Sequence, residues 1–293
     1  MSLSQFPRYF RRTIVVTVAF WSLAPGCSPG TAETGEFSNP EAQTIQRIQG
    51  IPAPPGYSRI KTTHGFALFL RNLRLLPSKT VYLYNGKRKG NQEAHFRIVD
   101  LSVGKKDLQQ CADALIRIRS EYFWHSNQKE KISFHFTSGD VSSYSKWRDG
   151  FRPAIRGSKV SFQKTEGYDA SYGSFFKYLE NLFTYAGTIS LKLDSKPVTG
   201  TVSPGDFFLE SGSPGHAIMI LDIVEDPNGK RLYLLGQSYM PAQQFHVLRN
   251  PLMPGEAVPG YERYGNVWYD IDPGKEVRTP EWVFPANALR RWK

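Results

Sequence analysis

The second half of the chain alternates between short apolar runs and turn residues, a pattern typical of an antiparallel sheet. Three apolar runs of strand length follow one another: DFFLES, HAIMILDIV and RLYLLGQSY. The last two are separated by Asp226-Pro227-Asn228-Gly229, a strong turn sequence. Because strands joined by so short a connection run in opposite directions, the pattern predicts an antiparallel hairpin that bends near Asn228.

The first half of the chain contains segments with apolar residues at helical spacing. In KKDLQQCADALIRIRSEYFW, one helical face carries Leu108, Cys111 or Ala112, Leu115, Ile118 and Tyr122. Asp107 can cap this helix, with Gln110 three residues further on. A second helix is predicted in YDASYGSFFKYLENLFTYAGT, beginning near Ser171 and ending at Gly187.

Three further segments complete the predicted elements. GFALFLRNLRLLP is typical of a short helix that ends before Pro77. Strands Thr80–Tyr84 and Ala94–Val103, joined through Asn85-Gly86, are predicted to form a hairpin, and KISFHFTSG alternates like a strand. We therefore expect residues 45–293 to form a single α+β domain, with helices packed on an antiparallel sheet.

The N-terminal segment has the organisation of an export signal. The basic stretch MSLSQFPRYFRR precedes TIVVTVAFWSLA, an apolar run too short to span a membrane as a stable helix, and PGC follows. We expect residues 1–27 to be a signal peptide of lipoprotein type, with lipid attached to Cys27. Ordinary signal cleavage is the alternative, since Pro25 is unusual in a lipobox, and the RRTIVV stretch faintly resembles a twin-arginine signal. Residues 28–44 are small, polar and contain Pro and Gly, as in a flexible tether.

Charge and localisation together limit the classes of partner. The chain of 293 residues has 37 Lys and Arg against 26 Asp and Glu, a net charge of +11, which favours anionic partners in general. Export to the cell envelope argues against nucleic acid, so we expect a membrane contact through the lipid anchor and a glycan or peptide partner. No metal-ligand spacing, phosphate loop or dinucleotide fingerprint occurs in the sequence, and we predict neither metal nor cofactor.

Cys111, His216 and Gln237 are the candidate catalytic residues. Hydrolysis of an amide by a thiol requires a nucleophilic sulfur, an imidazole base and a group that orients the imidazole. Cys111 falls in the first turn of its predicted helix, where unpaired N–H groups favour a thiolate, and His216 opens a predicted strand. Simple pairing about Asn228 places Gln237 opposite Met219, so only a bulge or a longer turn brings Gln237 beside His216.

The order of these residues resembles known families of the cell envelope. GHAIMI and GQSYM resemble the His and Asn regions of papain-like cysteine peptidases, with Gln237 in place of Asn. The run from GDFF to GHAIMILD is also similar to CHAP amidases and NlpC-type endopeptidases, which cut peptidoglycan peptides. This resemblance implies a papain-like fold. DLQQCADALIRIRSEYF, LFTYAGTISL and YLLGQSYMPAQ are similar over nearly the whole body to exported bacterial proteins called domain of unknown function 4846.

The sequence departs from the papain-like pattern before the cysteine. Papain-like enzymes have a Gly- or Asp-rich stretch there, whereas Gln109 and Gln110 precede Cys111. Either glutamine is able to donate to an oxyanion, but neither stands at the distance along the chain at which the papain-like glutamine does.

The stretch SYSKWRDGFRPAIRG carries a second candidate function. Tyr144, Trp147, Arg148 and Arg152 combine rings that stack on sugars with guanidinium groups that bind carboxylates. They are therefore candidate substrate-binding residues for a glycan or peptide stem. The alternative is a tryptophan packed over the core with solvated arginines around it.

The sequence thus leads to one hypothesis with two rivals. The first is an envelope thiol hydrolase, a peptidase or amidase acting on an amide bond such as those of peptidoglycan. The second is a non-catalytic envelope lipoprotein that binds glycan or peptide on the same scaffold. A purely structural envelope protein is the third. Under the two non-catalytic hypotheses Cys111 is a residue of the apolar core. It shares its helical face with Leu108 and Leu115, and free cysteines are often buried.

Overall fold

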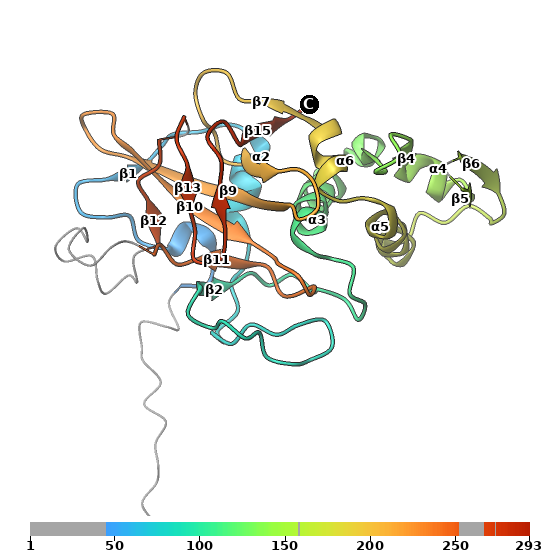
Figure 1. Cartoon of the computed structure of the whole chain (residues 1–293), viewed down its shortest axis with the longest axis horizontal. Coiled ribbons are helices and arrows are strands. Elements are labelled where there is room, and N and C mark those ends of the chain that lie inside the picture. Colours follow the sequence, from blue (N-terminus) through green and yellow to red (C-terminus); the bar gives the residue numbers. More distant parts are fainter. Residues whose placement is uncertain (1–44, 158, 252–266, 273) are drawn as a thin grey trace, which may run out of the picture. The chain divides into compact units, whose positions relative to one another are not determined.

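A nine-stranded antiparallel sheet forms the centre of the fold (Figure 1). We describe it from a computed structural model that covers residues 45–157, 159–251, 267–272 and 274–293. The predicted signal peptide, Cys27 and the tether lie outside these residues. Seven strands follow one another across the sheet, in the order β2 (His95–Ile98), β11 (His246–Leu248), β10 (Arg231–Gln237), β9 (His216–Glu225), β8 (Phe207–Glu210), β15 (Leu289–Trp292) and β7 (Ser195–Pro197). In addition, β1 (Ser58–Arg59) pairs with β9, and β12 (Trp268–Tyr269) pairs with β10.

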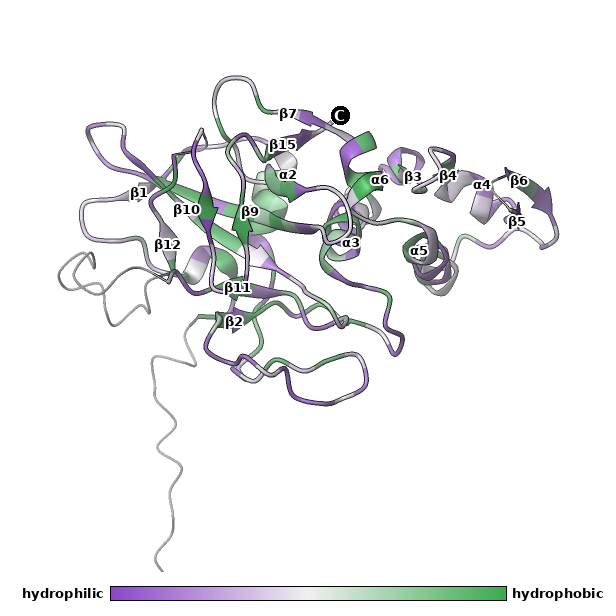
Figure 2. Cartoon of the chain, viewed as in Figure 1, coloured by the Kyte–Doolittle hydropathy of each residue, from purple (hydrophilic) through white to green (hydrophobic). Residues whose placement is uncertain are grey.

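The β9–β10 hairpin is the most deeply buried part of the sheet, and it was correctly predicted. Nine of the ten residues of β9 are buried, which explains why its sequence is apolar on both faces, and both strands are largely green in Figure 2. The Asp226–Lys230 turn closes the hairpin: Asp226 N–H donates to Lys230 C=O, and Gly229 adopts φ +84°, which glycine tolerates without strain.

Two apolar clusters cover the two faces of this hairpin. On one face Ala217, Met219 and Leu221 join the cluster that includes the helices α2 (Gly65–Asn72) and α3 (Cys111–His125). On the other face Ile218 and Ile220 join residues of the C-terminal segment, where β13 (Val277–Arg278) pairs with β14 (Val283–Phe284). The alternation of side chains along β9 therefore divides the core into two layers.

The remaining elements are short hairpins and helices between α3 and β8. They comprise η2 (Lys129–Lys131), β3 (Ser133–His135), β4 (Val141–Ser143), α4 (Tyr144–Arg148), β5 (Phe151–Arg156), β6 (Lys159–Lys164), α5 (Tyr172–Tyr185) and α6 (Thr188–Leu193), drawn in green to yellow in Figure 1. A further turn of 3-10 helix, η1 (Ile48–Gly50), precedes β1. Ser171 caps α5 by accepting from Ser174 N–H, as expected from the sequence. The fold is thus mixed α+β, with a large antiparallel sheet.

The predicted hairpin over residues 80–103 is wrong. A tight turn does form at Gly86, with φ +80°, but it joins only residues 81–83 to residues 87–89, with an isolated bridge between Tyr82 and Arg88. The second limb, β2, pairs instead with β11, which lies about 150 residues further along the chain. The local turn sequence was correctly interpreted, but the partner of β2 was decided by burial in the large sheet. No helix in the described residues is long and apolar enough to span a membrane.

Candidate functional site

Cys111 is the first residue of α3, so it lies in the first turn as predicted, although the helix begins later than a cap at Asp107 would place it. The residue before it, Gln110, is the N-cap, and its N–H donates to Asp113 Oδ2 over 3.2 Å. Asp107 is not the cap. Its Oδ1 accepts instead from Gln110 Nε2 at 3.0 Å and from Ala242 N–H at 2.7 Å, so it ties the start of α3 to the segment after β10.

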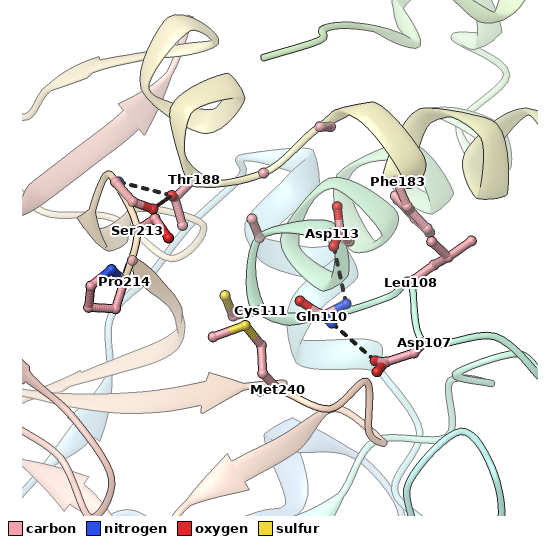
Figure 3. Close-up of a pocket in the computed structure, with 15 residues that line it drawn as sticks. Asp107, Leu108, Gln110, Cys111, Asp113, Phe183, Thr188, Ser213, Pro214 and Met240 are labelled. Carbon is pink, nitrogen blue, oxygen red and sulfur yellow. Dashed lines mark hydrogen bonds between the residues drawn. The ribbon is translucent and has the colours of Figure 1, made fainter.

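A cavity of about 230 Å³ lies beside Cys111. Its walls come from the start of α3, the α5–α6 connection and the loop that leads into β9. Figure 3 shows Cys111 and Met240 on one side of this cavity, across from the loop of Ser213 and Pro214. Thr188 of α6 holds this loop in place. Its Oγ1 donates to Gly212 C=O and accepts from Gly212 N–H, both at 3.2 Å.

The thiol of Cys111 is buried, and this decides its acidity. Only 5% of the residue is exposed, and burial raises the pKa of the thiol to about 11, with a further increase from the Asp113 carboxyl. The N–H groups of Ala112, Ala217 and Cys111 act in the opposite direction. The acidic thiol expected at a helix N-terminus is therefore not found, because desolvation outweighs the helix dipole, and the sulfur is protonated at neutral pH.

A β-bulge brings Gln237 to His216. The register Arg231↔Glu225 continues to Leu234 and then shifts by one residue, so that Gly236 lies opposite Met219. Continued by one residue, this register places Gln237 opposite Ile218, on the face of β9 that His216 shares. Gln237 Oε1 lies 2.9 Å from His216 Nε2. The bulge that the predicted contact required is thus present.

The amide of Gln237 is oriented by two acceptors. Its Nε2 donates to Glu281 Oε2 at 2.8 Å and lies 3.5 Å from His246 Nε2. His246 Nδ1 lies 2.9 Å from Gln244 C=O, which only accepts, so the proton of His246 is on Nδ1 and its Nε2 carries the lone pair. Both amide hydrogens of Gln237 thus face acceptors, and its Oε1 must face His216.

This orientation determines the tautomer of His216. Because Gln237 Oε1 only accepts, His216 Nε2 must carry the proton, and His216 Nδ1 is left with a free lone pair. Glu281 is itself held by an ion pair, with its Oε1 2.5 Å from Lys89 Nζ. Lys89, Glu281, Gln237 and His216 form a continuous chain of contacts that we call the amide relay.

His216 lies in an aromatic enclosure. Its ring centroid is 4.7 Å from that of Tyr239, 5.1 Å from Trp282 and 5.7 Å from Phe284. Burial lowers the pKa of His216 to about 4, although the hydrogen bond to Gln237 opposes this shift. The imidazole is therefore neutral at pH 7, the form that a general base requires.

Cys111 contacts β9 at the residue that follows His216. The sulfur accepts from the N–H of Ala217, the residue that follows His216. Within the described part of the chain, no hydrogen bond joins the sulfur to the His216 ring, whose pKa is governed by burial and Gln237. His216 does not line the cavity beside Cys111, and its ring packs against Trp282 and Phe284 in the layer opposite α3, so the backbone at Ala217 is the contact that links the two groups in the described residues.

The second predicted group of site residues belongs to a different region. Tyr144 is fully buried and only 9% of Trp147 is exposed, so neither ring forms an open platform for a sugar. Arg152 stacks on Trp147 at 3.8 Å, and Arg148 pairs with the neighbouring Asp149. None of the four residues lines the cavity beside Cys111. The structure agrees with the alternative of a tryptophan packed on the core beneath arginines.

Sequence reasoning missed the outer part of the amide relay. Lys89 and Glu281 lie about 150 and 45 residues from Gln237, and no local motif marks either of them. His246 stands in no recognisable motif of the sequence either, and no group of three or more His, Cys, Asp or Glu side chains in the described residues is arranged to hold a metal ion. The one available clue was that an isolated carboxylate at position 281 lies among the aromatic and apolar residues of EWVF.

Comparison with known proteins adds one finding. No curated protein and no solved structure matches the chain. The model of one family, described as a domain of unknown function (4846), matches residues 48–291, which include Cys111, His216, Gln237 and Glu281. The protein therefore belongs to the domain of unknown function (4846) family.

Proposed function

We propose that the protein is a thiol hydrolase of the cell envelope, a papain-like peptidase or amidase that cleaves an amide bond of peptidoglycan type. The observation that carries this proposal is the amide relay, which leaves His216 Nδ1 as a neutral base one residue before Ala217, whose N–H contacts the sulfur of Cys111 at the first position of a helix. The order Cys111, His216, Gln237 along the chain, and the predicted export signal, support the same conclusion.

In the proposed mechanism Cys111 is the nucleophile. Its sulfur attacks the carbonyl carbon of the substrate while the thiol proton passes to His216 Nδ1. The negative charge on the carbonyl oxygen is stabilised by N–H groups at the start of α3, where those of Cys111 and Ala112 already point to the sulfur.

His216 then supplies the proton for the leaving group. The C–N bond breaks, the amine takes the proton from Nδ1, and a thioester remains on Cys111. Water attacks the thioester, again losing its proton to Nδ1, and the sulfur recovers a proton as the carboxylic acid leaves. Gln237 Oε1 stabilises the imidazolium that forms in both steps.

Substrate binding has to activate this pair. The pKa values of about 11 for Cys111 and about 4 for His216 make proton transfer in the resting state strongly unfavourable. A substrate in the 230 Å³ cavity places its polar carbonyl beside the sulfur and draws the proton transfer into the same step as the attack.

The pKa values also favour the second candidate, a binding module without catalysis. A buried neutral thiol and a buried neutral imidazole are what a packed, inactive site would contain. In this case the same cavity holds a peptide or glycan group that is released unchanged.

Incubation of the purified protein with peptidoglycan fragments separates the two candidates. A hydrolase releases a new amine and a new carboxylic acid, and Cys111→Ala lowers this rate by at least about 10³-fold. Met240→Leu is the matched control, because it alters the same cavity without touching the thiol and should leave most of the rate. Turnover that survives Cys111→Ala excludes the thiol mechanism, and fragments that bind but emerge intact establish the binding module.

A further inference from the structure

A second hollow, separate from the cavity of Cys111, lies at the far half of α3. It has a volume of about 480 Å³ and lies between α3, β3 and the end of β15. We call it the Arg119 hollow, and its polar wall consists of Arg119, Lys131, Ser133, Asp194 and Lys293, with Trp292 beside them. None of these residues lines the cavity of Cys111.

Arg119 is held in place by aromatic rings rather than by a carboxylate. Its guanidinium carbon lies 4.5 Å from the ring centroid of Phe123 and 4.6 Å from that of Phe66. In the described residues no carboxylate approaches the guanidinium within the 4.0 Å of an ion pair, and no side-chain hydrogen bond from it is formed. Burial lowers the pKa of Arg119 to about 10, which reflects a cation that has lost water without gaining an anion.

The carboxylates near Arg119 are occupied by other partners. Asp194 accepts from His135 N–H at 3.0 Å and lies 2.5 Å from His135 Nδ1. Asp206, which lines a smaller hollow on the other side of Arg119, accepts from Arg291 with both oxygens at 2.6 Å. Neither carboxylate is therefore free to neutralise Arg119.

The rest of the Arg119 hollow is suited to an anion. Lys131 adds positive charge to the same wall, and its Nζ is bonded to an uncharged acceptor, Gln128 Oε1, at 2.7 Å. Trp292 lies between the two hollows, and its buried Nε1–H has no partner in the described residues. A buried donor without an acceptor is costly, so a ligand that accepts hydrogen bonds gains more here than on an open surface.

We propose that the Arg119 hollow is a binding site for an anionic group, a carboxylate or a phosphate, which pairs with the guanidinium of Arg119. A guanidinium whose faces contact aromatic rings keeps its N–H groups for such a partner, with which an arginine forms two parallel hydrogen bonds. The site is independent of the proposed hydrolase, since it shares no residue with the cavity of Cys111.

Titration of the purified protein with inorganic phosphate and, separately, with acetate tests this proposal. The indole N–H resonance of Trp292, assigned with Trp292→Phe, should shift with saturation, while the amide of Cys111 stays unchanged. Tighter binding of phosphate than of acetate identifies a phosphate site, and the reverse order a carboxylate site. Shifts that do not saturate, or that avoid Trp292, overturn the proposal.

Arg119→Met removes the charge but keeps a long side chain between the two rings. It should weaken binding of the preferred anion by at least about tenfold. Lys129→Met is the matched control, because Lys129 also stacks on a ring, that of Trp124 at 3.7 Å, but lies outside the hollow. Equal affinity in Arg119→Met and Lys129→Met contradicts the proposal. If Arg119→Met fails to fold, Lys131→Met should weaken binding instead. An unchanged affinity in Lys131→Met would then contradict the proposal.

Discussion

At the scale of single residues, the environment of a titratable group decides its pKa and its protonation state more than its position in a motif does. Cys111 has the helix position that usually makes a thiol acidic, yet burial raises its pKa to about 11. His216 has the neutral form and the tautomer of a base, because burial lowers its pKa and Gln237 fixes its proton. Of the two residues in the proposed mechanism, His216 thus has the protonation state that the mechanism requires, whereas Cys111 does not.

Glu281 should control the tautomer of His216 through the side chain of Gln237, which contacts both. In Glu281→Gln, Lys89 Nζ donates to the new amide oxygen, so the new NH₂ group faces Gln237. A donor at this place favours a Gln237 amide that is flipped, with its oxygen toward residue 281. A flipped amide donates to His216 Nε2 and moves the proton to Nδ1. Nitrogen NMR of His216 should therefore show a population shift from the Nε2–H to the Nδ1–H tautomer.

The control for this experiment is Glu276→Gln, which removes an exposed carboxylate paired with Arg278 in the same segment. It should leave the His216 spectrum unchanged. An unaltered tautomer in Glu281→Gln means that Glu281 only stabilises the fold, whether or not the protein hydrolyses any substrate.

At the scale of elements, one carboxylate joins three of them. Asp222 of β9 is fully buried, and its two oxygens each lie 2.7 Å from a guanidinium Nε, that of Arg59 on β1 and that of Arg71 on α2. This arrangement attaches the N-terminal elements to the central hairpin, next to the bulge that aligns Gln237. The position of His216 and Gln237 therefore depends on an ion pair outside the site.

Asp222→Asn should destabilise the protein strongly, by about 3–5 kcal/mol, because two largely buried arginines lose their anion. Urea unfolding measures the change in the free energy of unfolding. Asp270→Asn removes a carboxylate that pairs with Lys230 at 2.6 Å but is more than half exposed, and it should have little effect. Similar losses in the two variants would show that Asp222 does not join these elements.

At the scale of the whole molecule, several histidines are buried in their neutral form. Burial lowers the pKa of His216 to about 4 and that of His246 to about 3, and it also lowers that of His95. The unfolded chain, with ordinary histidine pKa values near 6.5, binds more protons than the folded chain below that pH. The free energy of unfolding is therefore largest above pH 6.5 and falls as the pH drops toward 4.

Between pH 7.5 and pH 5, His246 alone should account for a loss of about 2 kcal/mol in the free energy of unfolding. In His246→Gln this part of the pH dependence disappears, whereas substitution of the exposed His64 by Gln keeps it. Urea unfolding at the two pH values gives the comparison. The same loss in His246→Gln and in the unaltered protein would contradict the assignment of a neutral buried His246.

The α+β class, the β9–β10 hairpin, the N-cap of α5 and the place of Cys111 in the first turn of α3 were all predictable. Each depends on residues within a few turns or one hairpin of each other, where spacing and turn residues limit the backbone directly. The sequence predicted the contact of Gln237 with His216 only if the hairpin contained a bulge or a longer turn. The bulge lies between Leu234 and Leu235, and no residue type there indicates it.

The sequence by itself determined the elements, because the period of apolar residues fixes which backbone hydrogen bonds can form and which face is buried. The tertiary structure alone decided the partner of β2, the burial of Tyr144, the outer part of the amide relay and the acidity of Cys111. The physical reason is that desolvation and long-range pairing depend on segments that meet only after folding: Lys89, Gln237 and Glu281 come together from three distant parts of the chain, and a thiol at a helix start becomes acidic or inert according to what covers it.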